Sequence, residues 1–168
     1  MNVLFYVSGA IAIIAALMVI VSTNAAHAVV YLVLTFLAMA SVFLTLGAPL
    51  VGVLQIVIYA GAIIILFIFI IMMLDLGRQT RERERSWLSF PIWLLPSILS
   101  IVLIIEFAVV LSGHGTPNSG MVILPKEVGK TLYTHYVIGV ELVSILLLAA
   151  LVTGFHFGFS KCSGENHE

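Results

Sequence analysis

The sequence predicts an all-α integral membrane protein with five transmembrane helices. Of its 168 residues, 62% are hydrophobic and only 9% are charged, and the mean hydropathy is +1.23. Soluble domains have an apolar share of roughly 45–50%, so an aqueous core would not bury this much apolar surface. The apolar runs continue for about 20 residues, as membrane helices require, whereas strands of a membrane barrel alternate in polarity.

Five apolar runs follow one another along the chain, within one transmembrane domain that is expected to cover residues 1–168. The helices are expected over about residues 3–21, 27–46, 50–74, 87–111 and 136–159. The first run has no basic residue before it and no plausible cleavage site after it, so it is interpreted as a helix rather than a signal peptide. The first two connections are short, which predicts that the first three helices are antiparallel neighbours.

The basic residues predict the orientation of the helices in the membrane. Residues 77–86 form an arginine-rich loop after the third helix, and Lys161 lies in the tail. The loop after the fourth helix, residues 112–135, holds only Lys126 and Lys130. The positive-inside rule therefore places the arginine-rich loop and the C-terminus in the cytoplasm and the N-terminus outside. The glycines and prolines of the outer loop predict mostly turn there.

Aromatic residues near the ends of the expected helices fit the belts that tryptophan and tyrosine form at membrane interfaces. They are Trp87, Trp93, Tyr133 and Tyr136.

Signatures of soluble catalysis are absent, because the sequence has neither a Walker A loop nor a G-x-G-x-x-G motif. No two histidines are four residues apart on one span, and the single cysteine excludes both a disulfide and iron–sulfur ligation by this chain. No catalytic residue, metal, bound cofactor or nucleic-acid partner is expected.

Two carboxylates lie within the expected spans, and each would cost ~2.5–3.5 kcal/mol at a helix centre. Glu141 has Ser144 three residues later on the same face of the fifth helix. This pair is either a structural hydrogen bond to a neighbouring helix or part of a proton path or lateral coupling. Glu106 lies about one turn from the outer end of the fourth helix and is expected to reach the interface. Asp75 is expected to form an interfacial ion pair with the arginines.

The third helix carries polar and small residues in an otherwise apolar run. Gln55 and Tyr59 are four residues apart, so they share one face, which must point into protein or water. One interpretation is helix packing through small and polar residues. The other is a gate, because glycine and its small neighbours in Tyr59-Ala60-Gly61-Ala62 soften the helix and favour a π-bulge. A bulge there would rotate the second half of the helix and move a plug such as Phe67 into or out of a water path.

Several stretches of the sequence resemble one family of respiratory-chain subunits. They are VLQIVIYAGAIIILFIFIIMML (residues 53–74), NAAHAVVYLVLTFLAMASVFLTLGA (residues 24–48) and VGKTLYTHYVIGVELVSILLLAALV (residues 128–152). The chain resembles the subunit J family of bacterial proton-translocating NADH-quinone oxidoreductase (respiratory complex I), whose mitochondrial equivalent is chain 6. The resemblance covers nearly the whole chain.

The resemblance implies a multi-pass subunit of the bacterial inner membrane, packed in the lipid bilayer between the quinone-site subunits and the antiporter-like subunits. FMN, iron–sulfur clusters and quinone would lie in partner subunits, and this chain would help couple quinone reduction to proton translocation. It implies a π-bulge near Tyr59, Ala60 and Gly61, whose rotation gates a hydrated path. Some family members have glutamate where this chain has Gln55, so Gln55 is expected to order water rather than relay a proton.

Two other functions are compatible with the sequence. A purely structural membrane-arm scaffold would lose assembly when Tyr59 or Gly61 is replaced, with normal coupling in whatever complex survives. A stand-alone small transporter is the third alternative, although the sequence has no inverted repeat and few binding groups.

Overall fold

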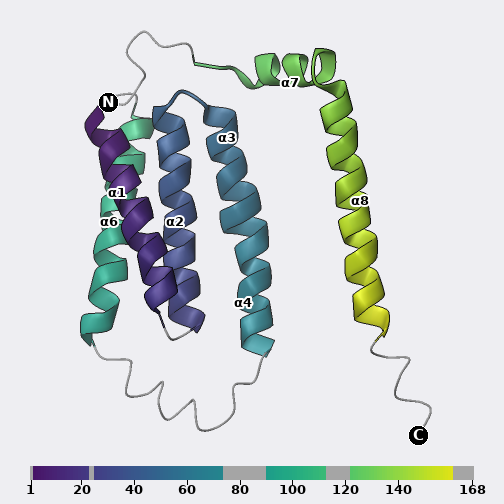
Figure 1. The fold of residues 1–168 in the computed structure, drawn as a ribbon. Helices are drawn as coiled ribbons and strands as arrows, with labels where there is room; N and C mark the ends of the chain where they lie inside the picture. The colour runs from purple at the N-terminus through teal and green to yellow at the C-terminus, as the bar shows by residue number, and fades with distance from the viewer. Residues whose placement is uncertain (1, 23–24, 74–89, 113–121, 161–168) are drawn as a thin grey trace, which may run out of the picture. The chain divides into compact units, whose positions relative to one another are not determined.

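The computed structural model describes residues 2–22, 25–73, 90–112 and 122–160, and these residues form helices and short connections without any strand (Figure 1). Five helices are long and apolar enough to cross a membrane, which confirms the predicted all-α architecture with five candidate spans. These spans are Val3–Val21, Ala25–Thr45, Pro49–Met73, Trp93–Leu111 and Val137–Gly158.

The chain divides into two compact units, Met1–Leu124 and Pro125–Glu168. The first unit contains the helices α1 (Asn2–Val21), α2 (Ala25–Thr45), α3 (Pro49–Leu54), η1 (Gln55–Ile63), α4 (Ile64–Met73) and α6 (Phe90–Leu111). The second contains α7 (Pro125–Thr134) and α8 (Val137–Ser160). The expectation of a single domain stays a prediction, since each unit is described by itself.

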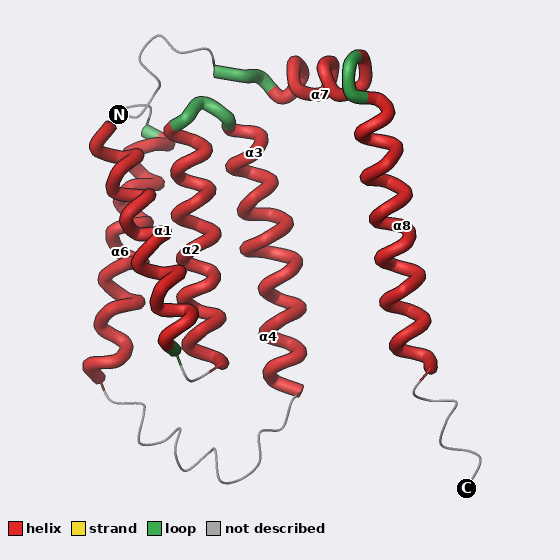
Figure 2. Tube along the Cα trace, viewed as in Figure 1, coloured by secondary structure: helices red, strands yellow, loops and turns green. Residues whose placement is uncertain are grey.

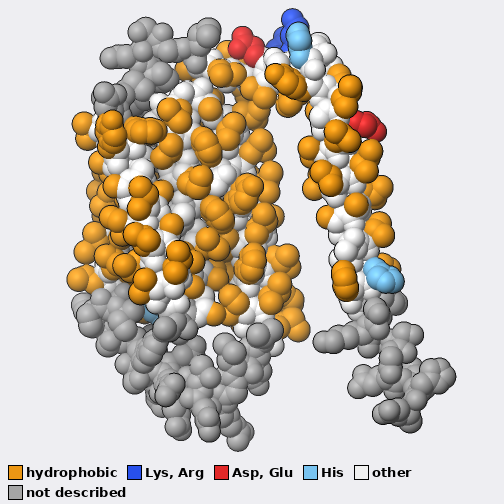
Figure 3. Space-filling model, viewed as in Figure 1, with side chains coloured by type: hydrophobic (Ala, Val, Ile, Leu, Met, Phe, Trp, Pro, Cys, Tyr) orange, Lys and Arg blue, Asp and Glu red, His pale blue; other side chains and the backbone are white. Residues whose placement is uncertain are grey.

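The helices α3, η1 and α4 follow one another without a break, and we call them together the third rod (Figure 2). The third rod corresponds to the third predicted helix. Its outward surface is covered by hydrophobic side chains, as is the rest of the visible face of the first unit (Figure 3). Such a surface suits contact with lipid or with other apolar helices, because a soluble protein rarely exposes so large an apolar area.

The core of the first unit lies where α1, α2 and α6 meet. Ala15 of α1 and Ala38 of α2 are completely buried, so these two helices pack closely, as small residues allow in membrane proteins. The other buried members of this core are Ile11, Tyr31, Leu34, Leu99 and Leu103. Helix α6 contains Pro96 within its length, and the Ser100 hydroxyl donates to the Pro96 carbonyl oxygen at 2.8 Å.

The turn between α2 and α3 is built on glycine and proline. Gly47 has a φ of 78°, in the left-handed region that glycine adopts without strain. The Gly47 N–H donates to Leu44 O and the Ala48 N–H donates to Phe43 O, which is the Schellman pattern at a helix C-terminus. Pro49 then occupies the start of α3, where its missing N–H is not needed. The chain thereby reverses within a few residues, so α2 and α3 are neighbours as predicted.

The other face of α2 packs against the third rod through Gly52. A Cβ atom at Gly52 would lie 3.1 Å from the Ala40 carbonyl oxygen and 3.1 Å from Leu44 Cγ. Helix α2 therefore lies between two sets of partners, α1 and α6 on one face and the third rod on the other.

The second unit departs from the prediction in the outer loop. Residues 125–134, expected to be turn, form the helix α7. Pro125 suggested a turn, but proline is favoured in the first turn of a helix, and Glu127 in that first turn complements the helix dipole. No residue in the most apolar window of α8 is buried within the structure.

Several predictions fall on residues that the structure does not describe. They concern the arginine-rich loop at residues 77–86, Asp75, Trp87 and Lys161, which lie outside the described residues. The orientation of the chain in the membrane therefore stays a prediction.

Candidate functional site

The third rod changes its hydrogen-bonding pattern in its middle. At its start, the Gln55 N–H donates to the carbonyl oxygens of Gly52 and Val51, as in ordinary helical turns. Nine residues, Gln55–Ile63, are then π-helical. The Ile64 N–H bonds to the Tyr59 carbonyl oxygen five residues earlier, as well as to Gly61 O. A π-helix is rare and is found most often as a single turn at functional sites.

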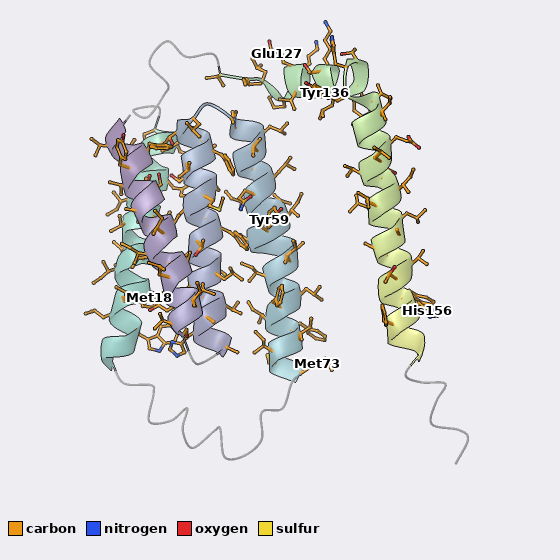
Figure 4. All side chains as sticks on the ribbon, in the orientation of Figure 1. Met18, Tyr59, Met73, Glu127, Tyr136 and His156 are labelled. Carbon is orange, nitrogen blue, oxygen red and sulfur yellow. The ribbon has the colours of Figure 1, made fainter. Side chains whose placement is uncertain are left out.

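The π-helix includes the residues that the sequence singled out as a hinge. Tyr59, Ala60 and Gly61 lie within it, and Gln55 is its first residue. Tyr59 lies near the middle of the third rod (Figure 4). Ala60 and Gly61 are half-buried, and a Cβ atom at Gly61 would lie 3.4 Å from Ile56 O, an ordinary van der Waals contact. The backbone conformation expected at this position is therefore present.

Tyr59 connects the π-helix to α2 through an aromatic contact. The rings of Tyr59 and Phe36 have centroids 5.2 Å apart and planes inclined by 53°. Tyr59 is nevertheless 44% exposed, so part of its ring is available to a partner or to lipid. Gln55 is half-buried, and its expected role in ordering water stays a prediction.

Phe67, the expected plug, lies on α4 and is 48% exposed. It is not among the residues that line a pocket of about 560 Å³ between α2, η1 and α6. That pocket is lined by Val30, Val33, Leu34, Leu37, Ile56, Ser100, Leu103, Ile104 and Phe107. Its lining is almost entirely apolar, so it suits a hydrocarbon chain and not a water path. The role of Phe67 stays a prediction.

Glu106 lies in a different place from the one expected. The sequence predicted that its side chain reaches the interface, but it is only 3% exposed and faces Ser8 of α1 and Ser41 of α2. The prediction was wrong because the face of α6 that carries Glu106 packs against the other two helices and not toward lipid. Sequence analysis missed the two serines as partners, since spacing along one helix does not show which residues of other helices meet.

Glu141 and Ser144 belong to the second unit and are both exposed within it. They share one face of α8, as their spacing of three residues predicts. An exposed carboxyl group on an apolar helix is unfavourable in lipid. The pair therefore requires another protein surface, and its role in coupling stays a prediction.

Metal ligands do not gather anywhere in the described ranges. Neither unit contains a group of three or more histidine, cysteine, aspartate or glutamate side chains that could hold a metal ion within those ranges.

The chain is similar to known proteins over almost all of its length. Residues 15–157 match the model of the NADH-ubiquinone/plastoquinone oxidoreductase chain 6 family. The chain is 45% identical to NADH-quinone oxidoreductase subunit J of Escherichia coli (strain K12), over 98% of this chain and 90% of that protein. It is 46% identical to the subunit J of Pseudomonas aeruginosa, over 94% of this chain and 96% of that protein. The subunit J of Buchnera aphidicola subsp. Acyrthosiphon pisum is 41% identical, over 99% and 98% respectively.

Proposed function

The chain belongs to the NADH-ubiquinone/plastoquinone oxidoreductase chain 6 family, and from this membership we propose that it acts as subunit J in the membrane arm of a proton-translocating NADH-quinone oxidoreductase. The proposal rests on high identity over nearly the full length of subunit J proteins. Five candidate spans support a place in the bacterial inner membrane. The other complex I subunits would be its partners, among them the quinone-site and antiporter-like subunits.

In this proposal the subunit has no redox centre of its own. FMN, the iron–sulfur clusters and quinone would be bound by partner subunits, which carry out electron transfer. The contribution of this chain is mechanical: it links events at the quinone site to the movement of protons through a hydrated path in neighbouring subunits.

The single observation that carries the mechanical role is the π-helix at Gln55–Ile63. An α-helix has 3.6 residues per turn, so one residue more or less in a helix turns everything beyond it by roughly 100°. If the π-helix closes to an α-helix while α3 stays in place, α4 must rotate relative to α3. Such a rotation would move Phe67 and its neighbours and so open or close the hydrated path.

The contacts at the two ends of the π-helix support a hinge at this position. At the α3 end, Gly52 lies against the backbone of α2, where a Cβ atom would be only 3.1 Å from the Ala40 carbonyl oxygen. At the α4 end, Ile64 is 1% exposed. Between these two buried residues, Tyr59 and its small neighbours are half-buried or exposed. The segment that would move is therefore less tightly packed than Gly52 and Ile64 at its two ends.

The test is replacement of Gly61 by valine. A β-branched side chain loses rotamer freedom in a helix and crowds the preceding turn, so it should hinder the change between the two helical forms. We expect Gly61→Val to lower the number of protons moved per NADH oxidised, while the peripheral partners keep most of their NADH oxidation. Both quantities are measured in membrane vesicles that contain the assembled complex.

The matched control is Gly9→Val, because a Cβ atom at Gly9 of α1 meets nothing within 4 Å in this chain. Equal losses of pumping and NADH oxidation in Gly61→Val would contradict the gate. Reduced assembly with normal coupling in the remaining complex would favour a structural scaffold instead.

A further inference from the structure

Three polar side chains from three different helices meet inside the first unit. Ser8 of α1 and Ser41 of α2 have no exposed surface, and Glu106 of α6 is 3% exposed. The Glu106 carboxyl group faces both serine hydroxyls. The α2 residues that contact Gly52 and Tyr59 of the third rod are different ones, namely Ala40, Leu44 and Phe36.

The hydrogen bonds of this cluster are incomplete among the described residues. The Ser8 hydroxyl donates to Leu4 O at 2.7 Å. Ser41 Oγ and both carboxyl oxygens of Glu106 have no hydrogen-bond partner within the parts of the chain that the structure describes. Buried polar atoms without partners are unfavourable by about 1–3 kcal/mol each.

One added proton would allow all of these groups to be paired. A neutral carboxylic acid has one O–H donor and one carbonyl acceptor, and a serine oxygen can accept a bond while its own hydrogen is donated elsewhere. The acid O–H would donate to Ser8 Oγ, and the Ser41 hydroxyl would donate to the other carboxyl oxygen. An ionised carboxylate has no O–H to donate to Ser8 Oγ. The Ser8 hydroxyl could not donate to the carboxylate either, because its hydrogen is already bonded to Leu4 O.

No positive charge accompanies Glu106. The described parts of α1 and α2 contain neither lysine nor arginine, and their titratable groups are Tyr6, His27 and Tyr31. His27 lies at the other end of the bundle, against Trp93 with ring centroids 5.6 Å apart. The described part of α6 has no other charged residue. An ionised carboxylate without a partner is costly inside a membrane protein.

We propose that Ser8, Ser41 and Glu106 form a proton-binding site, with the proton held on the Glu106 carboxyl group and exchanged with the aqueous face at the end of the bundle where α1 begins. The three residues lie four to six residues inside the ends of their helices at that end. At a rise of roughly 1.5 Å per residue, the site lies about 6–9 Å from the helix ends. One small rearrangement of α1 against α2 therefore suffices to admit water.

The test is infrared spectroscopy of the purified, assembled complex from wild-type and variant strains. The wild type should show a carboxylic-acid C=O band that is lost in Glu106→Gln, because glutamine keeps the shape and neutrality of the acid without its proton. The band should shift to lower frequency after transfer to D2O. Ser41→Ala should shift it to higher frequency, because the carbonyl then loses a hydrogen-bond donor.

The control is Glu141→Gln, which removes the other intramembrane carboxyl group and should leave this band in place. Identical carboxylic-acid C=O bands in wild type and Glu106→Gln would show that Glu106 is ionised and would overturn the proposal. A band that is lost in Glu106→Gln but never shifts in D2O would overturn the exchange with the aqueous face.

Discussion

At the scale of single residues, Gly52 shows how closely α2 approaches the third rod. The site of its missing Cβ lies 3.1 Å from a backbone oxygen of Ala40, which cannot move aside as a flexible side chain would. Overpacking of this kind typically costs about 1–3 kcal/mol. Gly52 is thus a packing residue, whereas Gly61, with only an ordinary contact at 3.4 Å, is free for a conformational role.

We expect Gly52→Ala to destabilise the membrane complex, because the new methyl group must push α3 away from α2. The measurement is the half-life of the assembled complex during heating in detergent, which should shorten. Gly9→Ala is the control, since its methyl group enters open space and alanine favours helix by roughly 1 kcal/mol over glycine. A half-life for Gly52→Ala equal to that of Gly9→Ala would mean that the two helices do not approach in this way.

The contact between Tyr59 and Phe36 leads to a second residue-scale prediction. Aromatic pairs at this separation contribute about 0.5–1.5 kcal/mol beyond the burial of their area. In a double-mutant cycle, Tyr59→Leu and Phe36→Leu should show a coupling energy within that range, measured by thermal stability of the complex. Tyr59→Phe keeps the ring and should keep the coupling. Additive effects of the two leucine variants would show that the rings do not interact.

At the scale of elements, the third rod contains one residue more than a continuous α-helix needs between its two anchors. Deleting Ala60 should therefore let the segment close as an α-helix while Ile64 still faces α2. We expect this deletion to preserve assembly and NADH oxidation but to abolish proton pumping, because no residue is left to shift. A density map of the complex would show the backbone hydrogen bonds, and vesicle assays would report pumping.

The control for this deletion is removal of Ile65 from the regular helix α4. That change turns the rest of α4 by roughly 100°, so the complex should fail to assemble. If the density map shows a regular α-helix in the Ala60 deletion and the complex still pumps protons normally, then the π-helix is not needed for proton pumping.

Much of the arrangement of helices was predictable from the sequence. Long apolar runs define the five spans, and small residues beside Tyr59 marked the place where the helix departs from α-geometry. The length of the π-helix was not predictable, since it depends on the fixed points Gly52 and Ile64, which tertiary packing supplies. The burial of Glu106 was missed for a related reason: its partners Ser8 and Ser41 come from helices far away in the sequence. The α7 helix was missed because Pro125 marks helix starts as well as turns.

At the scale of the whole molecule, α8 presents Glu141 and Ser144 as exposed side chains within its own unit. We expect Glu141→Leu to reduce the amount of assembled complex on native gels, because the hydrogen bonds to a partner subunit are lost. Glu141→Gln should assemble normally if the partner supplies donors, since an amide oxygen also accepts hydrogen bonds. Normal assembly of Glu141→Leu would show that this face of α8 contacts no polar partner.

The orientation of the whole chain is testable with its single cysteine. The positive-inside rule places Cys162 in the cytoplasm, so a membrane-impermeant thiol reagent should label it in inside-out vesicles but not in intact spheroplasts. The double variant Thr134→Cys, Cys162→Ser moves the thiol to the end of α7 and should reverse this pattern. Labelling of Cys162 in intact spheroplasts would invert the predicted orientation.

Helix α2 has the largest buried share of the five candidate spans, 39% of its apolar window, whereas the third rod has 6%. Stability within a protein varies from segment to segment, and segments with few buried contacts open first. In hydrogen–deuterium exchange, the amides of α2 should therefore stay protected longest, and those of the third rod should exchange through local opening at much lower free energy. A rod in this position can fluctuate between conformations many times while the three-helix core beside it stays folded.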